Sequence, residues 1–132
     1  MNSLSALGKQ EALRNVRQRA IQTLEAHIRQ VPEDARARIL LSNYYVEENR
    51  QDDAIREVNL AALLRPNDAV VHYNAACTYC KMGKKVETLD ALGKAWRTGF
   101  RDADWVRRDP DLASLRGDPE FERLYPEKPA GA

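Results

Sequence analysis

The chain of 132 residues is long enough for one domain that buries its own core without disulfides or metals. Its 21 basic and 20 acidic side chains nearly cancel, so no overall positive charge draws it to nucleic acid or to an anionic membrane. Aromatic residues make up only 7%, and glycine and proline number six each, which argues against a turn-rich β-sandwich and favours an all-α protein.

No segment has the pattern of a targeting or membrane-spanning sequence. Residues 1–16 lack the apolar centre of a signal peptide, and no apolar run has the length of a membrane span. We therefore expect a cytoplasmic protein whose two cysteines remain reduced.

Residues 9–31 are predicted to form one long helix. Apolar residues recur along it at helical spacing, and no turn signal interrupts them before Pro32. This stripe consists of Leu13, Val16, Ala20, Leu24, Ile28 and Val31.

A first pair of helices follows in residues 35–68. Asp34 is a suitable N-cap for a helix over 35–48, and Asn49, a residue that tolerates a left-handed backbone, ends it. A second helix over 53–65 ends at Pro66, which cannot continue a helix. Two helices joined by so short a turn must bury their apolar faces on each other.

Residues 69–100 repeat this plan. Asp68 is the N-cap of a helix over 69–82, Gly83 ends it, and a return helix runs over 85–99. Shifting the chain by 34 residues superposes Pro32 on Pro66, Asp34 on Asp68, Ala35 on Ala69, Tyr45 on Tyr79 and Ala61 on Ala95. The same shift matches residues of similar character, such as Leu41 with Ala75, Ser42 with Ala76, Asn49 with Gly83 and Val58 with Leu92. The sequence therefore predicts two copies of one helical hairpin.

Short helices are predicted over residues 101–125, before a tail at 126–132. Three Asp residues stand at their starts, and two of these are followed by Pro, which is favoured at the first helical position. The three are Asp102, Asp109 and Asp118. We expect this segment to cover the open apolar face of the last hairpin with Trp105, Leu112, Leu115 and Phe121.

The two predicted hairpins resemble the tetratricopeptide repeat family. The first hairpin matches its pattern with Leu41, Ser42, Tyr45, Ala54, Val58, Ala61 and Pro66, and the second with His72, Ala75, Ala76, Tyr79, Leu92 and Ala95. Arg38, Thr88 and Phe100 depart from it. Residues 101–125 resemble the end-of-array segment found in bacterial signalling proteins such as cyclases and Ser/Thr kinases.

The resemblance implies a single all-α helical solenoid over residues 1–132, with the long N-terminal helix at one end and a C-terminal cap at the other. The long helix then stands where the second helix of a preceding repeat would be, and residues 3–8 are the candidate remnant of its missing partner. Either the chain is a fragment of a longer signalling protein, or this helix is a terminal cap.

The resemblance also implies a groove that binds a peptide or helix of a partner protein. Its implied lining is Arg36, Ile39, Asn43, Val46 and Glu47 from the first hairpin and Val70, Tyr73, Asn74, Cys77, Cys80 and Lys81 from the second. Asn43 and Asn74 match two positions of grooves that hold acidic chaperone tails, but Ile39 and Val70 occupy places where that pattern carries Lys. A partly apolar ligand is the better match.

Cys77 and Cys80 form a C-x-x-C spacing, which raises the alternative of thiol or metal chemistry. On a helix their Cβ atoms lie about 5 to 6 Å apart, too far for a disulfide. Cys77 falls in mid-helix rather than at an N-terminus that would activate its thiolate, and His72 is predicted to point toward the packed side. We expect no bound metal, no cofactor and no catalytic residue. Self-association through the long N-terminal helix is the main alternative to partner binding.

Overall fold

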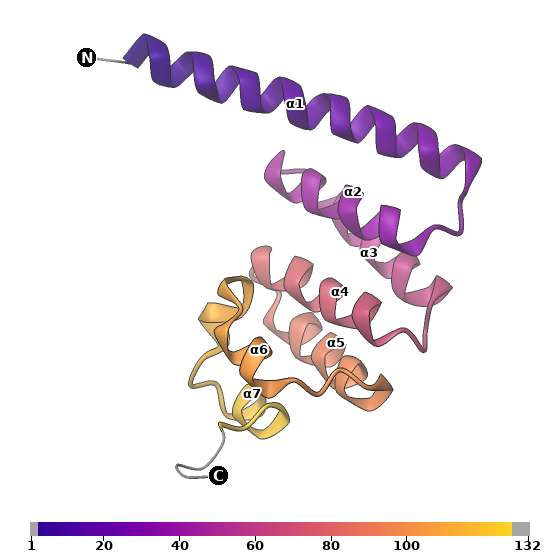
Figure 1. Ribbon diagram of the computed structural model, residues 1–132, viewed down its shortest axis with the longest axis vertical. Helices are drawn as coiled ribbons and strands as arrows, with labels where there is room; N and C mark the ends of the chain where they lie inside the picture. Colours follow the sequence, from indigo (N-terminus) through magenta and orange to yellow (C-terminus); the bar gives the residue numbers. More distant parts are fainter. Residues whose placement is uncertain (1–2, 128–132) are drawn as a thin grey trace.

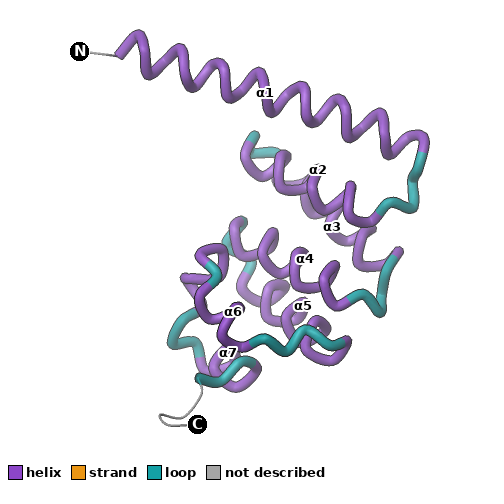
Figure 2. Tube along the Cα trace, viewed as in Figure 1, coloured by secondary structure: helices purple, strands orange, loops and turns teal. Residues whose placement is uncertain are grey.

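The computed structural model describes residues 3–127, with side chains from residue 5 onward, and is built from helices (Figures 1 and 2). The elements are α1 (Ser3–Gln30), α2 (Ala35–Glu47), α3 (Gln51–Leu64), α4 (Ala69–Lys81), α5 (Lys85–Thr98), α6 (Ala103–Arg108), the 3-10 helix η1 (Pro110–Leu115) and α7 (Pro119–Leu124). No strand occurs in this part of the chain, so the prediction of an all-α fold is confirmed. Within residues 3–127, no helix combines the length and apolar character that a membrane span requires.

Aspartate caps start five of these elements, as the sequence predicts. Each Asp side chain accepts a hydrogen bond from a backbone N–H of the first turn, which satisfies a donor that has no partner inside the helix. The five caps are Asp34, Asp68, Asp102, Asp109 and Asp118. The acidic residues of the C-terminal segment are thus accounted for largely by local backbone geometry.

The turns inside the two hairpins have the same geometry. Asn49 and Gly83 both adopt a positive φ, of 59° and 73°. The next backbone N–H then donates back into the preceding helix, from Arg50 to the Tyr45 carbonyl at 2.8 Å and from Lys84 to the Tyr79 carbonyl at 3.0 Å. These residues lie 34 apart, so the sequence repeat is also a structural repeat.

The hairpins are stacked. Helix α2 packs against α3 and helix α4 against α5, while α2 and α3 both contact α4 across the stack (Figure 1). Helix α1 lies on α2, and η1 packs on α4 at the opposite end of the chain. Equivalent positions of the two hairpins are buried: Leu41 and Ala75, Ser42 and Ala76, Ala54 and Thr88, Val58 and Leu92, Ala61 and Ala95.

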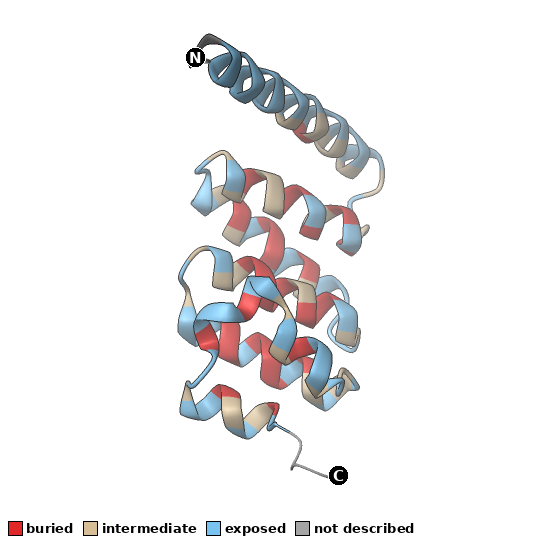
Figure 3. Ribbon diagram, turned by 60° about the vertical axis from the view of Figure 1, so that its left-hand side comes forward, coloured by how far each residue is buried: buried red, intermediate tan, exposed pale blue. Residues whose placement is uncertain are grey.

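Figure 3 shows in red the buried positions along the helices. The apolar residues among them form two clusters. The larger one extends from Ile39 of α2 and Val58 of α3 through α4 and α5 into the C-terminal segment, where it includes the fully buried Phe121 and Tyr125. The smaller one holds α1 to the first hairpin and centres on Ile21, Leu41 and Tyr45. The two hairpins and the C-terminal segment therefore share the larger cluster, whereas the contact with α1 belongs to the smaller one.

Two expectations for the chain ends need correction. Helix α1 begins at Ser3 rather than at residue 9, so residues 3–8 are its first turns and not the remnant of a separate helix. Trp105 does not cover the last hairpin, because its side chain is 56% exposed and the neighbouring Val106 is buried instead. Leu112, Leu115 and Phe121 are buried as predicted. Residues 128–132 of the predicted tail lie outside the described residues.

Candidate binding surfaces

The predicted groove residues lie along α2 and α4, and we call this side of the molecule the α2–α4 face. Asn43 connects the two helices there. Its side-chain oxygen accepts hydrogen bonds from the Thr78 hydroxyl at 3.1 Å and from the Lys81 ammonium group at 3.3 Å. Its amide nitrogen donates to the Ile39 carbonyl at 3.2 Å. Asn43 therefore contributes to helix packing as well as to the surface.

Part of α4 on this face is covered by the protein's own C-terminal segment. The Tyr73 hydroxyl donates to Asp109, and the Tyr73 ring stacks on Phe100 with 4.1 Å between ring centroids. Further along α4, the Cys77 Sγ lies 3.8 Å from the same Asp109 carboxylate, and the Cys80 Sγ lies 3.3 Å from the Ser114 hydroxyl. Tyr73 and Cys77 are buried by these contacts, which corrects the expectation that they are open to a partner.

We call Tyr73, Cys77 and Cys80 the covered row. Burial determines the protonation state of the Tyr73 hydroxyl and the Cys77 thiol. Burial first, and then the nearby Asp109 charge, raise the pKa of the Cys77 thiol to about 12. The pKa of the Tyr73 hydroxyl is likewise raised by burial and by its hydrogen bond to Asp109. The Cys77 thiol is therefore protonated at neutral pH and is a poor nucleophile.

The covered row also brings together a group of atoms with the character of metal ligands. One ligand atom each from Cys77, Asp109 and Asp111 lie within 4.8 Å of one another. Two features oppose a cation there: the thiol is held in its protonated form, and the Lys81 ammonium group already lies 3.7 Å from Asp111. Neither histidine joins the group, because His72 bonds the Pro66 carbonyl and His27 bonds Asp34.

The two cysteines are free and differ in exposure. Cys77 is buried, whereas Cys80 is partly accessible. Each is held by a separate residue of the C-terminal segment, Asp109 and Ser114 respectively. The C-x-x-C spacing thus places two thiols against a packed segment of the same chain.

The rest of the α2–α4 face is open. Arg36 and Glu47 are exposed as expected, Val70 is 41% exposed, and Asn74 is half-buried. Ile39 is buried and Val46 is half-buried, so neither offers the open apolar surface that was predicted. The neighbouring Leu40, which is 50% exposed, offers it instead. We call the exposed set of Arg36, Leu40, Glu47, Val70 and Asn74 the open row.

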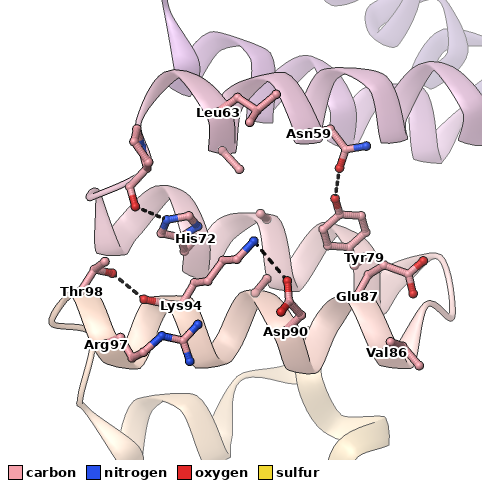
Figure 4. A pocket seen from close by; sticks show the side chains of 14 residues that line it. Asn59, Leu63, His72, Tyr79, Val86, Glu87, Asp90, Lys94, Arg97 and Thr98 are labelled. Atoms are coloured by element: carbon pink, nitrogen blue, oxygen red, sulfur yellow. Dashed lines mark hydrogen bonds and ion pairs between the residues drawn. The ribbon is translucent and has the colours of Figure 1, made fainter.

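A second surface was missed by the sequence interpretation. A groove of about 780 Å³ runs between α3 and α5 with α4 at its base, on the side where the second helices of the hairpins lie (Figure 4). We call it the α3–α5 groove. Its lining includes Asn59, Leu63, His72, Tyr79, Val86, Glu87, Asp90, Lys94 and Arg97. The available signal was two aliphatic residues on solvent-facing positions, since Leu63 is 75% and Val86 77% exposed.

The base of the α3–α5 groove is held by side-chain hydrogen bonds. The Tyr79 hydroxyl donates to the Asn59 side chain, which connects α4 to α3. On the α5 side, Lys94 pairs with Asp90 at 3.2 Å. Burial, together with the charges of Glu87 and Asp90, raises the pKa of Tyr79, so acidic side chains lie close to this part of the groove.

Comparison with known proteins shows a partial similarity to a plant protein. No protein-family model matches the chain. The chain is 40% identical over 60 residues to a chloroplastic protein from Arabidopsis thaliana. The match covers 45% of this chain and 18% of the plant protein, so the chain spans less than a fifth of that relative's length.

Proposed function

We propose that the chain is a tetratricopeptide-type helical solenoid that binds a segment of another protein and catalyses no reaction. The observation that supports this most is the repetition of one helical hairpin at a spacing of 34 residues, with equivalent positions buried and equivalent turns closed by the same hydrogen bond. A cytoplasmic location belongs to the same proposal, and the two free cysteines are consistent with a reducing compartment.

The partner segment contacts the open row of the α2–α4 face. Leu40 and Val70 supply exposed aliphatic surface, and Asn74 adds an amide that can pair with the backbone of an extended ligand. Arg36 and Glu47 add one charge of each sign. This composition suits a segment with apolar residues between polar ones, rather than a strongly acidic or basic tail.

The test is to select ligands from a peptide library against the purified chain and to measure their affinity for matched variants. Leu40→Glu and Val70→Glu alter exposed side chains, so the fold is retained and the affinity is expected to fall at least about tenfold. Leu63→Glu, which changes an exposed leucine in the α3–α5 groove, is the control and leaves the affinity unchanged.

Two outcomes would contradict the proposal: a library that yields no ligand, or ligands that bind the Leu40→Glu and Val70→Glu variants as tightly as the unaltered chain. Tyr73 and Asn43 are unsuitable for this test. Their side chains hold the C-terminal segment and α4 in place, so their replacement would confuse binding with folding.

A further inference from the structure

The N-terminal half of α1 extends beyond the first hairpin. Arg17 forms an ion pair with Glu48 at 3.2 Å, at the end of α2, and Ile21 is the first residue of α1 that is buried. Before Arg17, residues 5–16 are all exposed, and Figure 1 shows this part of α1 running past the α2–α3 turn. Leu13 and Val16 are 58% and 59% exposed there.

Leu13 and Val16 form an apolar pair with basic neighbours. At 100° per residue they lie about 60° apart on one side of the helix. Lys9 is one turn before Leu13 and Arg19 is just under one turn after Val16, whereas Glu11 points to the opposite side at this spacing. Exposed apolar pairs on a helix beside basic residues are suited to a groove with acidic residues.

The α3–α5 groove has these features. Its lining includes two exposed aliphatic residues, Leu63 on α3 and Val86 on α5 (Figure 4). Glu87 follows Val86 along the α5 wall. Further along this wall Asp90 pairs with Lys94 and Arg97 follows, so the acidic end of the groove is the end near Val86. Residues 5–20 form a helical rod about 24 Å long, and the α5 wall from Val86 to Thr98 is about 20 Å long. The helix and the groove therefore match in length and in apolar content, and Glu87 provides a carboxylate for a basic side chain at the Val86 end.

We propose that the N-terminal half of α1 from one copy of this chain docks in the α3–α5 groove of a second copy. Leu13 and Val16 enter between Leu63 and Val86, and Lys9 faces Glu87. The charges select this arrangement over contact between two α1 helices. Residues 5–20 carry four basic side chains and one acidic one. Two copies of this segment would therefore repel each other.

The contact is heterologous, because the two copies use different surfaces. The two copies either dock reciprocally as a closed dimer or continue as an open chain of copies. This property makes the proposal testable by mixing. A copy with a defective α1 and a copy with a defective groove still retain one functional surface each.

The experiment measures the mass of the full chain by sedimentation over a wide concentration range. The unaltered chain is expected to associate. Leu13→Glu with Val16→Glu, and separately Leu63→Glu with Val86→Glu, are each expected to weaken association at least about 30-fold. All four side chains are more than half exposed, so the variants keep their fold, which circular dichroism verifies. Leu40→Glu is the matched control and associates normally.

An equimolar mixture of the two double variants is expected to form a 1:1 complex, although neither variant associates alone. Glu87→Lys is expected to weaken association several-fold, and adding Lys9→Glu in the same chain to restore it. The proposal is overturned by a monomeric unaltered chain, by groove variants that still associate, by α1 variants that still associate, or by a mixture without a complex. None of these outcomes bears on partner binding at the open row.

Discussion

Ile39 and Tyr73 occupy the same position in the two hairpins, yet they contact different parts of the chain. Both residues are 5% exposed, but Tyr73 stacks on Phe100 and donates to Asp109 in the C-terminal segment. The Ile39 carbonyl instead accepts hydrogen bonds from Ser42 and Asn43 of its own helix. The next equivalent pair differs in the same way: Cys77 lies against Asp109, and Asn43 bridges to Thr78 and Lys81. The partners of a repeat position therefore differ between the two hairpins, because the C-terminal segment packs on the second hairpin.

The largest expected effect concerns the larger core cluster. Phe121 is fully buried in the larger core cluster, so Phe121→Ala is expected to lower the free energy of unfolding by about 3 to 5 kcal/mol. Leu13→Ala, at an exposed site on α1, should change it by less than about 0.5 kcal/mol. Urea denaturation followed by circular dichroism measures both. Equal costs would mean that the C-terminal segment is not part of the cooperative core.

The second prediction concerns two tyrosine hydroxyls, one bonded to the C-terminal segment and one bonded to α1. Tyr73 donates to Asp109, and Tyr45 donates to Glu25 on α1 at 2.5 Å. Replacing either by Phe leaves a carboxylate short of a donor, at a cost of about 1.5 to 3 kcal/mol. Hydrogen exchange distinguishes them: Tyr73→Phe is expected to speed exchange in η1, and Tyr45→Phe in α1. Faster exchange in the same segment for both variants would contradict this division.

Alkaline pH should affect the second hairpin through Cys77. In the unfolded chain a thiol loses its proton near pH 8.5 to 9, whereas the folded Cys77 has a pKa of about 12. Between these values the unfolded state binds fewer protons, so the free energy of unfolding falls as pH rises, by up to about 1.4 kcal/mol per pH unit.

Urea denaturation at about pH 8 and about pH 10 measures this slope, and Cys77→Ala should reduce it. Tyr125 adds a further loss at higher pH, because burial raises its pKa to about 12. An unchanged slope in Cys77→Ala would show that its thiol ionises equally in both states. The counterpart of Cys77 in the first hairpin, Asn43, does not titrate and contributes nothing.

The smallest effect is expected at equivalent helix caps. Asp34→Ala and Asp68→Ala each remove a cap and should cost about 1 kcal/mol, whereas Asn at either position keeps the cap. Asp34 also bonds His27 at 2.7 Å near the end of α1, so its loss should additionally loosen that end. Urea denaturation gives the cost of each, and hydrogen exchange locates the loosening. Identical exchange patterns for the two Ala variants would argue against a role of Asp34 in holding α1.

Much of the helical framework follows from the sequence. The Asp caps, the left-handed Asn49 and Gly83, and the burial of Val58 and Leu92 at equivalent positions were predicted from patterns of nearby residues. Helix starts and turns depend on hydrogen bonds within a few residues, and apolar spacing identifies the face that must be buried. The implied groove was less well predicted, because Tyr73 and Cys77 are buried and Leu40 replaces Ile39 in the open row. In the C-terminal cap, Trp105 faces solvent instead of the last hairpin.

The sequence by itself thus determined where the helices begin, where they turn and which of their faces pack in the repeat. Only the tertiary structure decided which surface stays available. Asp109 meets Tyr73 across 36 residues, and the α3–α5 groove is formed by residues of three helices. Such contacts depend on how complete elements pack against one another, and this information is not contained in any local pattern of residue types.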